Sequence, residues 1–265
     1  MPLPCPPDKF HCDCSDRHRF VVIIPVYNHA ATVSDVIHRA QRHGFPVIVV
    51  DDGSSDATYE NIKAIQGIQV VRHRNNLGKG AALLSGMREA IKSAADWAIC
   101  LDADGQHDPD EMLQLMEAIP AGLRPIIIGK RKVMTSAPWT SRFGRKFSNF
   151  WVWVSSGVLL TDSQSGYRLY PLPDILNLDV RARRYQYEVE VLAKAAWRSI
   201  PIIEVPVSVS YSPGGKRISH FHPWRDFVRN SRTFSHLIVR RLFSPHLWFL
   251  NSRSKRMVEP SQIDE

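Results

Sequence analysis

Two aspartates separated by one residue, Asp102 and Asp104 with Ala103 between them, carry the clearest chemical signal in the sequence. They follow an apolar run at 97–101, so both carboxylates are expected at the end of a buried strand, where the small Ala103 leaves room for a ligand. Carboxylate oxygens are hard ligands that suit Mg²⁺ or Mn²⁺. An isolated Asp-x-Asp is more often a solvated loop or a helix cap, so the neighbouring motifs decide its meaning.

A nucleotide diphosphate would explain this pair of carboxylates. Its clustered negative charge would be repelled by two aspartates unless a cation lay between them. The same cation would stabilise a departing diphosphate. The motif therefore predicts a divalent metal that holds a phosphorylated nucleotide.

The elements that would position this motif alternate between short apolar runs and helical segments. Uniformly apolar runs indicate strands covered on both faces by helices, which is typical of a parallel α/β sheet. The expected strands are 20–25, 45–50, 68–71, 97–101 and 125–128, and the expected helices are 31–42, 56–65, 80–94 and 109–119. A basic, aromatic helical stretch at 141–157, a helix at 187–197 and a strand at 202–209 follow. We expect Asp108 to cap the helix that begins at Pro109.

Polar residues follow the expected strands, at the edge where parallel sheets bind ligands. They are Tyr27 and Asn28, Asp51 and Asp52, residues 72–75, and residues 102–107. Gly78-Lys79-Gly80 opens a helix, where free N–H groups and an ammonium would bind an anion; the alternative is a flexible turn with a solvated lysine. Four loops are thus expected to converge on one crevice.

These motifs together resemble the family 2 glycosyltransferases. The resemblance rests on Asp102-Ala103-Asp104 with Pro25-Val26-Tyr27-Asn28, Asp51 to Asp56, Asn75 to Gly80 and Ser165-Gly166-Tyr167-Arg168, and it spans roughly residues 19–211. The nearest branch is the dolichol-phosphate mannosyltransferase-like one, which glycosylates polyprenyl phosphates. The resemblance implies an α/β fold of the GT-A class, Rossmann-like, with a mostly parallel central sheet.

Site roles follow from the resemblance, position by position. It assigns the nucleoside to Pro25, Tyr27, Asn28, Asp51 and Asp52, and the metal to Asp102, Asp104 and Gln106, with Asp104 the firmest ligand. Lys79 and Ala103 join the donor site, and His107 is either a ligand or a loop residue. Arg131, with Arg142, Arg145 and Lys146 nearby, matches positions that cradle phosphates. Arg168 would lie beside the acceptor or pair with a buried carboxylate.

The acceptor is inferred from a missing pair of acids. Enzymes that transfer sugar to a hydroxyl need a base to remove its proton, and many family members place a Glu-Asp or Asp-Asp pair here. This sequence offers only Glu188 or Glu190, which could equally orient a basic residue. A phosphate acceptor is already an anion, so the sequence favours direct attack by a lipid phosphate, with inversion. A hydroxyl acceptor in cell-surface glycan or glycolipid synthesis, a sugar-nucleotide nucleotidyltransferase or hydrolase, and a non-catalytic binding protein are the alternatives.

Charge and composition limit the partners. The 265 residues carry a formal net charge of +8 with 44% hydrophobic residues, which suits one globular domain and an anionic partner. We expect a disordered segment at 1–17, a catalytic domain at 18–212, a basic amphipathic helical segment at 213–257 and a disordered tail at 258–265. That basic segment would lie on an anionic membrane or pack on the core. No reading motif for nucleic acid accompanies it.

The cellular location is expected to be cytoplasmic, either free or peripheral on the inner face of the cell membrane. No apolar run in the sequence reaches the roughly 18 residues needed to cross a bilayer, and the Pro-rich start is unlike a signal peptide. The four cysteines are too few and too clustered for a disulfide framework, so we expect reduced thiols.

Overall fold

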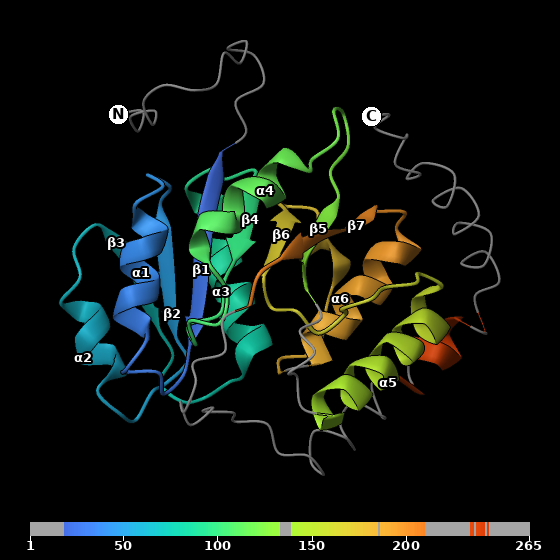
Figure 1. The fold of residues 1–265 in the computed structure, drawn as a ribbon, viewed down its shortest axis with the longest axis horizontal. Helices are drawn as coiled ribbons and strands as arrows, with labels where there is room; N and C mark the ends of the chain where they lie inside the picture. Colours follow the sequence, from blue (N-terminus) through green and yellow to red (C-terminus); the bar gives the residue numbers. More distant parts are fainter. Residues whose placement is uncertain are drawn as a thin grey trace.

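A single seven-stranded sheet organises the molecule (Figure 1). The computed structural model describes residues 19–132, 139–184, 186–209, 234–235, 237–241 and 243, with only the backbone for 139–147. The strands are β1 (Phe20–Val26), β2 (Val47–Asp51), β3 (Ile68–Arg72), β4 (Trp97–Cys100), β5 (Ile126–Arg131), β6 (Arg168–Pro171) and β7 (Ile202–Val207). The helices are α1 (Val33–Gln41), α2 (Thr58–Lys63), α3 (Lys79–Lys92), α4 (Met112–Glu117), α5 (Trp139–Ser156) and α6 (Gln186–Trp197), with short 3₁₀ turns at Pro109–Glu111 and Leu176–Leu178.

The strand order is β3-β2-β1-β4-β6-β5-β7. All neighbouring pairs are parallel except those of β6, which runs antiparallel to β4 and β5. The expected mostly parallel α/β sheet is therefore confirmed. The strand β6 was not expected, because its four residues follow the Ser165-Gly166-Tyr167 turn and contain Arg168 where an apolar residue would mark a strand.

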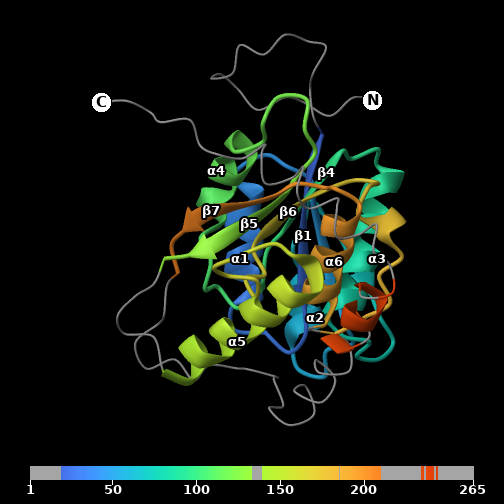
Figure 2. The ribbon, with the colours of Figure 1, turned by 90° about the vertical axis from the view of Figure 1, so that its right-hand side faces the viewer.

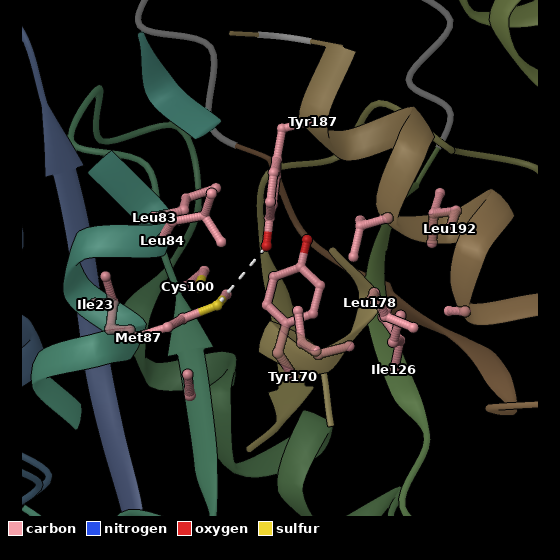
Figure 3. Packing of buried hydrophobic residues seen from close by; sticks show 14 of the residues in the cluster. Ile23, Leu83, Leu84, Met87, Cys100, Ile126, Tyr170, Leu178, Tyr187 and Leu192 are labelled. Carbon is pink, nitrogen blue, oxygen red and sulfur yellow. Dashed lines mark hydrogen bonds between the residues drawn. The ribbon is translucent and has the colours of Figure 1, made fainter. Parts of the chain in front are cut away.

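Two hydrophobic cores lie on the two faces of the sheet, and β1 feeds both. Its Val21 and Ile23 side chains point into the core under α3 and α6, whereas Val22, Ile24 and Val26 point into the core under α1 and α4. This alternation is the period-two pattern of a strand. Figure 2 shows the helices on either side of the sheet, and Figure 3 shows the first core, where the Tyr187 hydroxyl lies 3.7 Å from the Met87 sulfur. A sheet covered on both faces explains the uniformly apolar strands of the sequence.

The chain reverses its direction of travel across the sheet at β1. Strands β2 and β3 extend to one side of β1, and β4 lies on its other side. Ligands of open α/β sheets bind where such a reversal leaves a crevice at the carboxyl ends of the strands. The loops that follow β1 and β4, which hold Tyr27 and Asp102, flank this point.

Several expectations about the ends of the chain fall mostly on residues that the structure does not describe. Segments 1–17 and 258–265 lie entirely outside the described residues, and Arg142, Arg145 and Lys146 are described by backbone alone. Of the basic segment 213–257, residues 234–235 and 237–241 are helical and residue 243 lies in a turn. Among the described residues, no helix has the length and apolar character needed to span a bilayer.

The helix α3 packs closely on β1 because Gly86 has no side chain. A methyl group at Gly86 would lie 2.5 Å from Cγ2 of Ile23 and 3.2 Å from Cγ2 of Val50. Gly86→Ala should lower the free energy of unfolding by about 1–3 kcal/mol through overpacking, although alanine favours a helix. Urea denaturation measures the change, with the exposed Arg88→Ala on the same helix as the control. An unchanged or higher stability of Gly86→Ala would show that α3 can shift away from the sheet.

Candidate functional site

A pocket of about 260 Å³ opens at the carboxyl ends of β1, β2 and β4. Its walls come from the loops after these strands, from the start of α3, from the end of β5 and from the loop that precedes β6. The lining residues are Pro25, Val26, Tyr27, His29, Asp52, Asn76, Gly78, Lys79, Ala82, Asp102, Ala103, Asp104, Gln106, His107, Arg131, Gln164, Gly166, Arg184 and Glu188. Most residues that the sequence assigned to the site thus share one crevice.

A charged cluster of Lys79, Asp102 and Glu188 lies at the base of this pocket. The Lys79 Nζ atom lies 2.7 Å from Oδ1 of Asp102 and 2.7 Å from Oε1 of Glu188. Burial opposes the charge of Lys79, but its two carboxylate neighbours raise its pKa, and Lys79 together with its hydrogen bond lowers the pKa of Asp102. Lys79 is therefore not a solvated lysine in a flexible turn. Its ammonium binds both the carboxylate of Asp102, which follows β4, and the carboxylate of Glu188, which lies on α6.

The cluster fits only because residue 166 is glycine. A methyl group at Gly166 would lie 2.2 Å from Oδ2 of Asp102 and 2.5 Å from Nζ of Lys79. Both distances are far shorter than van der Waals contact. The Ser165-Gly166-Tyr167 segment therefore shapes the pocket, because its glycine lets the backbone approach the ion pair between Lys79 and Asp102.

Asp104, Gln106 and His107 form the next part of the pocket wall. Burial, and then the negative charge of Asp102, raise the pKa of Asp104. Burial lowers the pKa of His107, whose Nδ1 is buried without a hydrogen-bond partner in the described structure. The Asp104 carboxylate thus lines the pocket beside the charged cluster, in which two carboxylates already share the single ammonium of Lys79. The base of the pocket carries excess negative charge.

The two aspartates at the end of β2, Asp51 within the strand and Asp52 just after it, act on the backbone of neighbouring loops. Asp52 accepts hydrogen bonds from the backbone N–H groups of Leu77 and Gly78 and lies 2.7 Å from Nδ1 of His73. Asp51 accepts from the N–H of Ser54. Asp52 lines the pocket, whereas the fully buried Asp51 does not. The Asp52 carboxylate therefore fixes the loop that leads from β3 into α3, and the Asp51 carboxylate fixes the turn that follows β2.

Asn28 has a similar structural position. It adopts a left-handed conformation with φ of 54°, its N–H donates to Oγ of Ser54, and its Oδ1 accepts from the N–H of Ser55. It therefore joins the loops after β1 and β2 and lies outside the pocket wall, although the sequence had assigned it to the nucleoside. Asp56, at the end of the same motif as Ser54 and Ser55, accepts from the N–H groups of Thr58 and Ala30.

Arg131 ends β5 and forms a bidentate ion pair with Asp162. Its Nε and one terminal nitrogen each lie 2.7 Å from a carboxylate oxygen of Asp162, which is 1% exposed. Glu204 on β7 accepts from the backbone N–H groups of Thr161 and Asp162 and so fixes this loop. Arg131 lines the pocket from a firmly held position, and Asp162 is the partner that the sequence did not reveal.

Arg168 and Glu190 both lie outside the pocket wall, and the pairing of Glu190 agrees with the expected alternative that it orients a basic residue. Arg168 is 1% exposed, is not among the lining residues, and donates to the backbone carbonyls of Ser163, Ser165 and Glu188. These partners are carbonyls, not the carboxylate that the sequence offered as the alternative. Glu190 pairs with Lys194 at 2.7 Å and accepts from the N–H groups of Arg181 and Ala182. Both residues position the segments that carry Gly166 and Glu188.

Several lining residues were not singled out from the sequence. Arg184 and Asn76 meet at the edge of the pocket, where a nitrogen of Arg184 donates to Oδ1 of Asn76 over 3.2 Å. The Arg183 carbonyl accepts from the N–H of Ala81 in the first turn of α3, so the loop before α6 closes the start of α3. His29 and Gln164 complete the wall. Only the contact between distant loops reveals His29, Gln164 and Arg184, because none of these three lies in a motif singled out from the sequence.

A divalent cation is consistent with the oxygen atoms of this wall. Within the described residues, no group of three or more His, Cys, Asp or Glu side chains could hold a metal by itself. A cation here would use the carboxylate of Asp104 and the amide oxygen of Gln106, together with oxygens of a bound diphosphate. Its charge would favour the ionised form of Asp104, whose pKa is raised by burial and then by the charge of Asp102.

The ion pair between Arg131 and Asp162 predicts a large loss of stability on removing one charge. Asp162→Asn leaves the enclosed guanidinium without its counter-ion, so the free energy of unfolding should fall by about 3–5 kcal/mol. The matched control is Asp174→Asn, because Asp174 pairs with Arg124 in a partly exposed position, with side chains 40% and 39% exposed. That change should cost at most about 1 kcal/mol. Equal losses in the two variants, measured by urea unfolding, would contradict the assignment.

Comparisons with known proteins agree with this geometry. The UDP-N-acetylglucosamine–dolichyl-phosphate N-acetylglucosaminyltransferase of Methanococcus voltae is 30% identical, over 72% of this chain and 85% of that protein. The polyprenol monophosphomannose synthase of Mycolicibacterium smegmatis is 28% identical, over 72% of this chain and 77% of that protein. The chain is thus similar to glycosyltransferases that act on polyprenyl or dolichyl phosphates.

Solved structures and the family pattern complete the comparison. Mannosyl-3-phosphoglycerate synthase from Rubrobacter xylanophilus superposes with a TM-score of 0.60 at 17% identity, over 92% of this chain and 78% of that one, which confirms the GT-A fold. The family model described as glycosyl transferase family 2 matches residues 21–169, which is more than half of the chain. The protein therefore belongs to glycosyl transferase family 2 and is a glycosyltransferase.

Proposed function

We propose that the protein is a metal-dependent, inverting enzyme that moves a sugar from a nucleotide-sugar to a polyprenyl phosphate. The donor would occupy the pocket with its nucleoside near Pro25, Tyr27 and Asp52 and its diphosphate near Asp104. The acceptor phosphate would enter from the side of Arg131. The enzyme would work on the cytoplasmic side of the cell membrane, where its lipid acceptor is within reach.

The observation that carries the choice of acceptor is the engagement of both candidate bases. Glu188 lines the pocket, but its Oε1 is held by Lys79 at 2.7 Å. Glu190 is turned toward Lys194 and the backbone of residues 181–182. A hydroxyl acceptor would need one of them to take its proton. A phosphate monoester is an anion at neutral pH, so its oxygen can attack with no such base.

The proposed reaction is a single displacement at the anomeric carbon of the sugar. A phosphate oxygen of the acceptor forms the new bond to that carbon while the bond to the diphosphate oxygen breaks, and the nucleoside diphosphate leaves with the electron pair. When bound, a divalent cation would offset the charge that develops on the leaving diphosphate. Lys79 holds Asp102 and Glu188 in place, and Arg131 offsets negative charge at the acceptor side.

The excess negative charge at the base of the pocket supports the metal. Asp102, Asp104 and Glu188 together exceed the single charge of Lys79, so an unaccompanied diphosphate would be repelled. Asp104 is the residue proposed to hold the cation most directly, with Gln106 as a neutral oxygen ligand. Ala103 and Asp102 border the same donor site.

Asp104→Ala tests the proposed metal and reaction together. The wild-type protein with a polyprenyl phosphate, Mn²⁺ and a panel of nucleotide-sugars should form a sugar-lipid that extracts into organic solvent, with release of nucleoside diphosphate. The variant should lose product formation by at least about a hundredfold and should lose the metal-dependent part of its nucleotide affinity in calorimetry. Release of pyrophosphate by the wild type would instead indicate a nucleotidyltransferase.

Gly166→Ala tests whether the charged cluster shapes the donor site. The added methyl group would force Lys79 and Asp102 apart, and a displacement of about 1 Å in such a site costs on the order of a hundredfold in turnover. Arg88→Ala is the control, because Arg88 is an exposed residue of α3 that does not line the pocket. Circular dichroism should be unchanged in both. Normal turnover in Gly166→Ala would remove the cluster from the mechanism.

A further inference from the structure

Exposed hydrophobic side chains concentrate around α5 and the helical segment near residue 240. In the described part of the chain, eight large hydrophobic residues are exposed, and five of them are Phe150, Trp153, Leu159, Val239 and Phe243. Leu159 is 71% exposed and Phe243 is 83% exposed. Single exposed apolar residues are ordinary, but a gathered group of large ones marks a surface that contacts another apolar phase.

The helix α5 has one face for the protein and one for its surroundings. Val152, Ser155 and Ser156 are buried, and the Ser155 carbonyl accepts from the indole N–H of Trp197 on α6. Phe150 and Trp153, three residues apart, are exposed, and their rings lie 6.0 Å from one another. Because residues three apart share a helix face, these two aromatic rings form the outward side of α5.

The segment at 234–243 lies beside α5 and repeats its pattern. Leu237 is buried, and the Phe234 ring lies 6.1 Å from that of Trp151. A guanidinium nitrogen of Arg241 donates to the backbone carbonyls of Trp153 and Val154 in the last turn of α5. Val239 and Phe243, four residues apart, are exposed. Figures 1 and 2 both show this segment next to α5.

Positive charge accompanies this apolar surface. Arg240 is exposed beside Val239, and its guanidinium lies 5.7 Å from the centroid of the Trp197 ring. The sequence from 216 to 256 contains Asp226 as its one acidic residue, against Lys216, Arg217, Arg225, Arg229, Arg232, Arg240, Arg241, Arg253, Lys255 and Arg256. Aromatic and aliphatic side chains beside arginines are the combination that binds the interface of an anionic bilayer.

The position of α5 in the chain links this surface to the pocket. The helix follows β5, whose last residue Arg131 lines the pocket, and it precedes the loop that contributes Gln164 and Gly166 to the same wall. Along the chain, α5 therefore lies between two segments that line the pocket.

We infer that Phe150, Trp153, Leu159, Val239 and Phe243 form a membrane-docking surface that inserts into the interfacial region of an anionic lipid leaflet. The docking surface holds the Arg131 side of the pocket toward the lipid headgroups. This inference rests on the proposed function for the identity of the acceptor, but the binding to lipid can be measured without any transfer of sugar.

The test is partition of the full chain onto vesicles. Wild-type protein should cosediment with vesicles of phosphatidylcholine mixed with phosphatidylglycerol, and more weakly with phosphatidylcholine alone. The double variant Phe150→Ser, Trp153→Ser should lose at least about tenfold in partition coefficient, as expected when two large apolar side chains no longer leave water. The single variant Phe243→Ser should show a smaller loss of partition coefficient. It tests the same surface independently, in case the double variant does not fold.

The control variant is Ile91→Ser, because Ile91 is an exposed apolar residue on α3. Its partition should equal that of the wild type, and all variants should retain wild-type affinity for nucleotide with Mn²⁺. Wild-type partition by both the double variant and Phe243→Ser would overturn the inference, as would a wild-type dimer in sedimentation that the double variant abolishes. Transfer to a short-chain, water-soluble polyprenyl phosphate separates the two proposals: vesicle binding without such transfer refutes the proposed acceptor alone.

Discussion

The Lys79 ammonium holds together segments that come from three parts of the chain. Lys79 is the first residue of α3, Asp102 follows β4, and Glu188 lies in the first turn of α6. One cation therefore fixes the starts of α3 and α6 against the end of β4. Desolvating three charges is unfavourable unless each is paired. This pairing requires a glycine at position 166, because the backbone of Gly166 lies against the ion pair and any side chain there would overlap it. The four segments that carry Lys79, Asp102, Gly166 and Glu188 are therefore held together as walls of the pocket.

Much of the fold could be predicted from the sequence because its signals are local. A strand covered on both faces must be apolar along its length; β1 and β4 meet that condition at every residue, and β2 meets it up to its last residue, Asp51. The Asp108 cap is an example at finer scale, since its carboxylate accepts from the N–H of Asp110 as a helix-starting aspartate should. Parallel topology then places the polar loops at one edge, which is why Tyr27, Asp52, Lys79 and Asp104 share a pocket.

The remaining features depend on contacts between residues far apart in the chain. Nothing in the spacing around Arg168 shows that its guanidinium would be enclosed and satisfied by carbonyls, because a buried arginine and a substrate-binding arginine look alike in a sequence. The same holds for Asn28, whose left-handed backbone turns its side chain toward the loop after β2. Short antiparallel β6 escaped prediction since its hydrogen bonds to β4 and β5, and not its composition, make it a strand.

The sequence separation of the pocket contacts has a consequence for the order of folding. Lys79 and Glu188 are 109 residues apart, and the carbonyl that closes the first turn of α3 belongs to Arg183. Strands β1 to β4 and their covering helices can assemble from the first hundred residues or so, but the side of the pocket that contains Glu188 is missing until α6 has been synthesised. Contacts of such long range form late, since loop closure must precede them. A ribosome-bound intermediate that holds β1 to β4 would therefore leave Lys79 and Asp102 open to water, and it would acquire its binding site only when the last third of the chain docks.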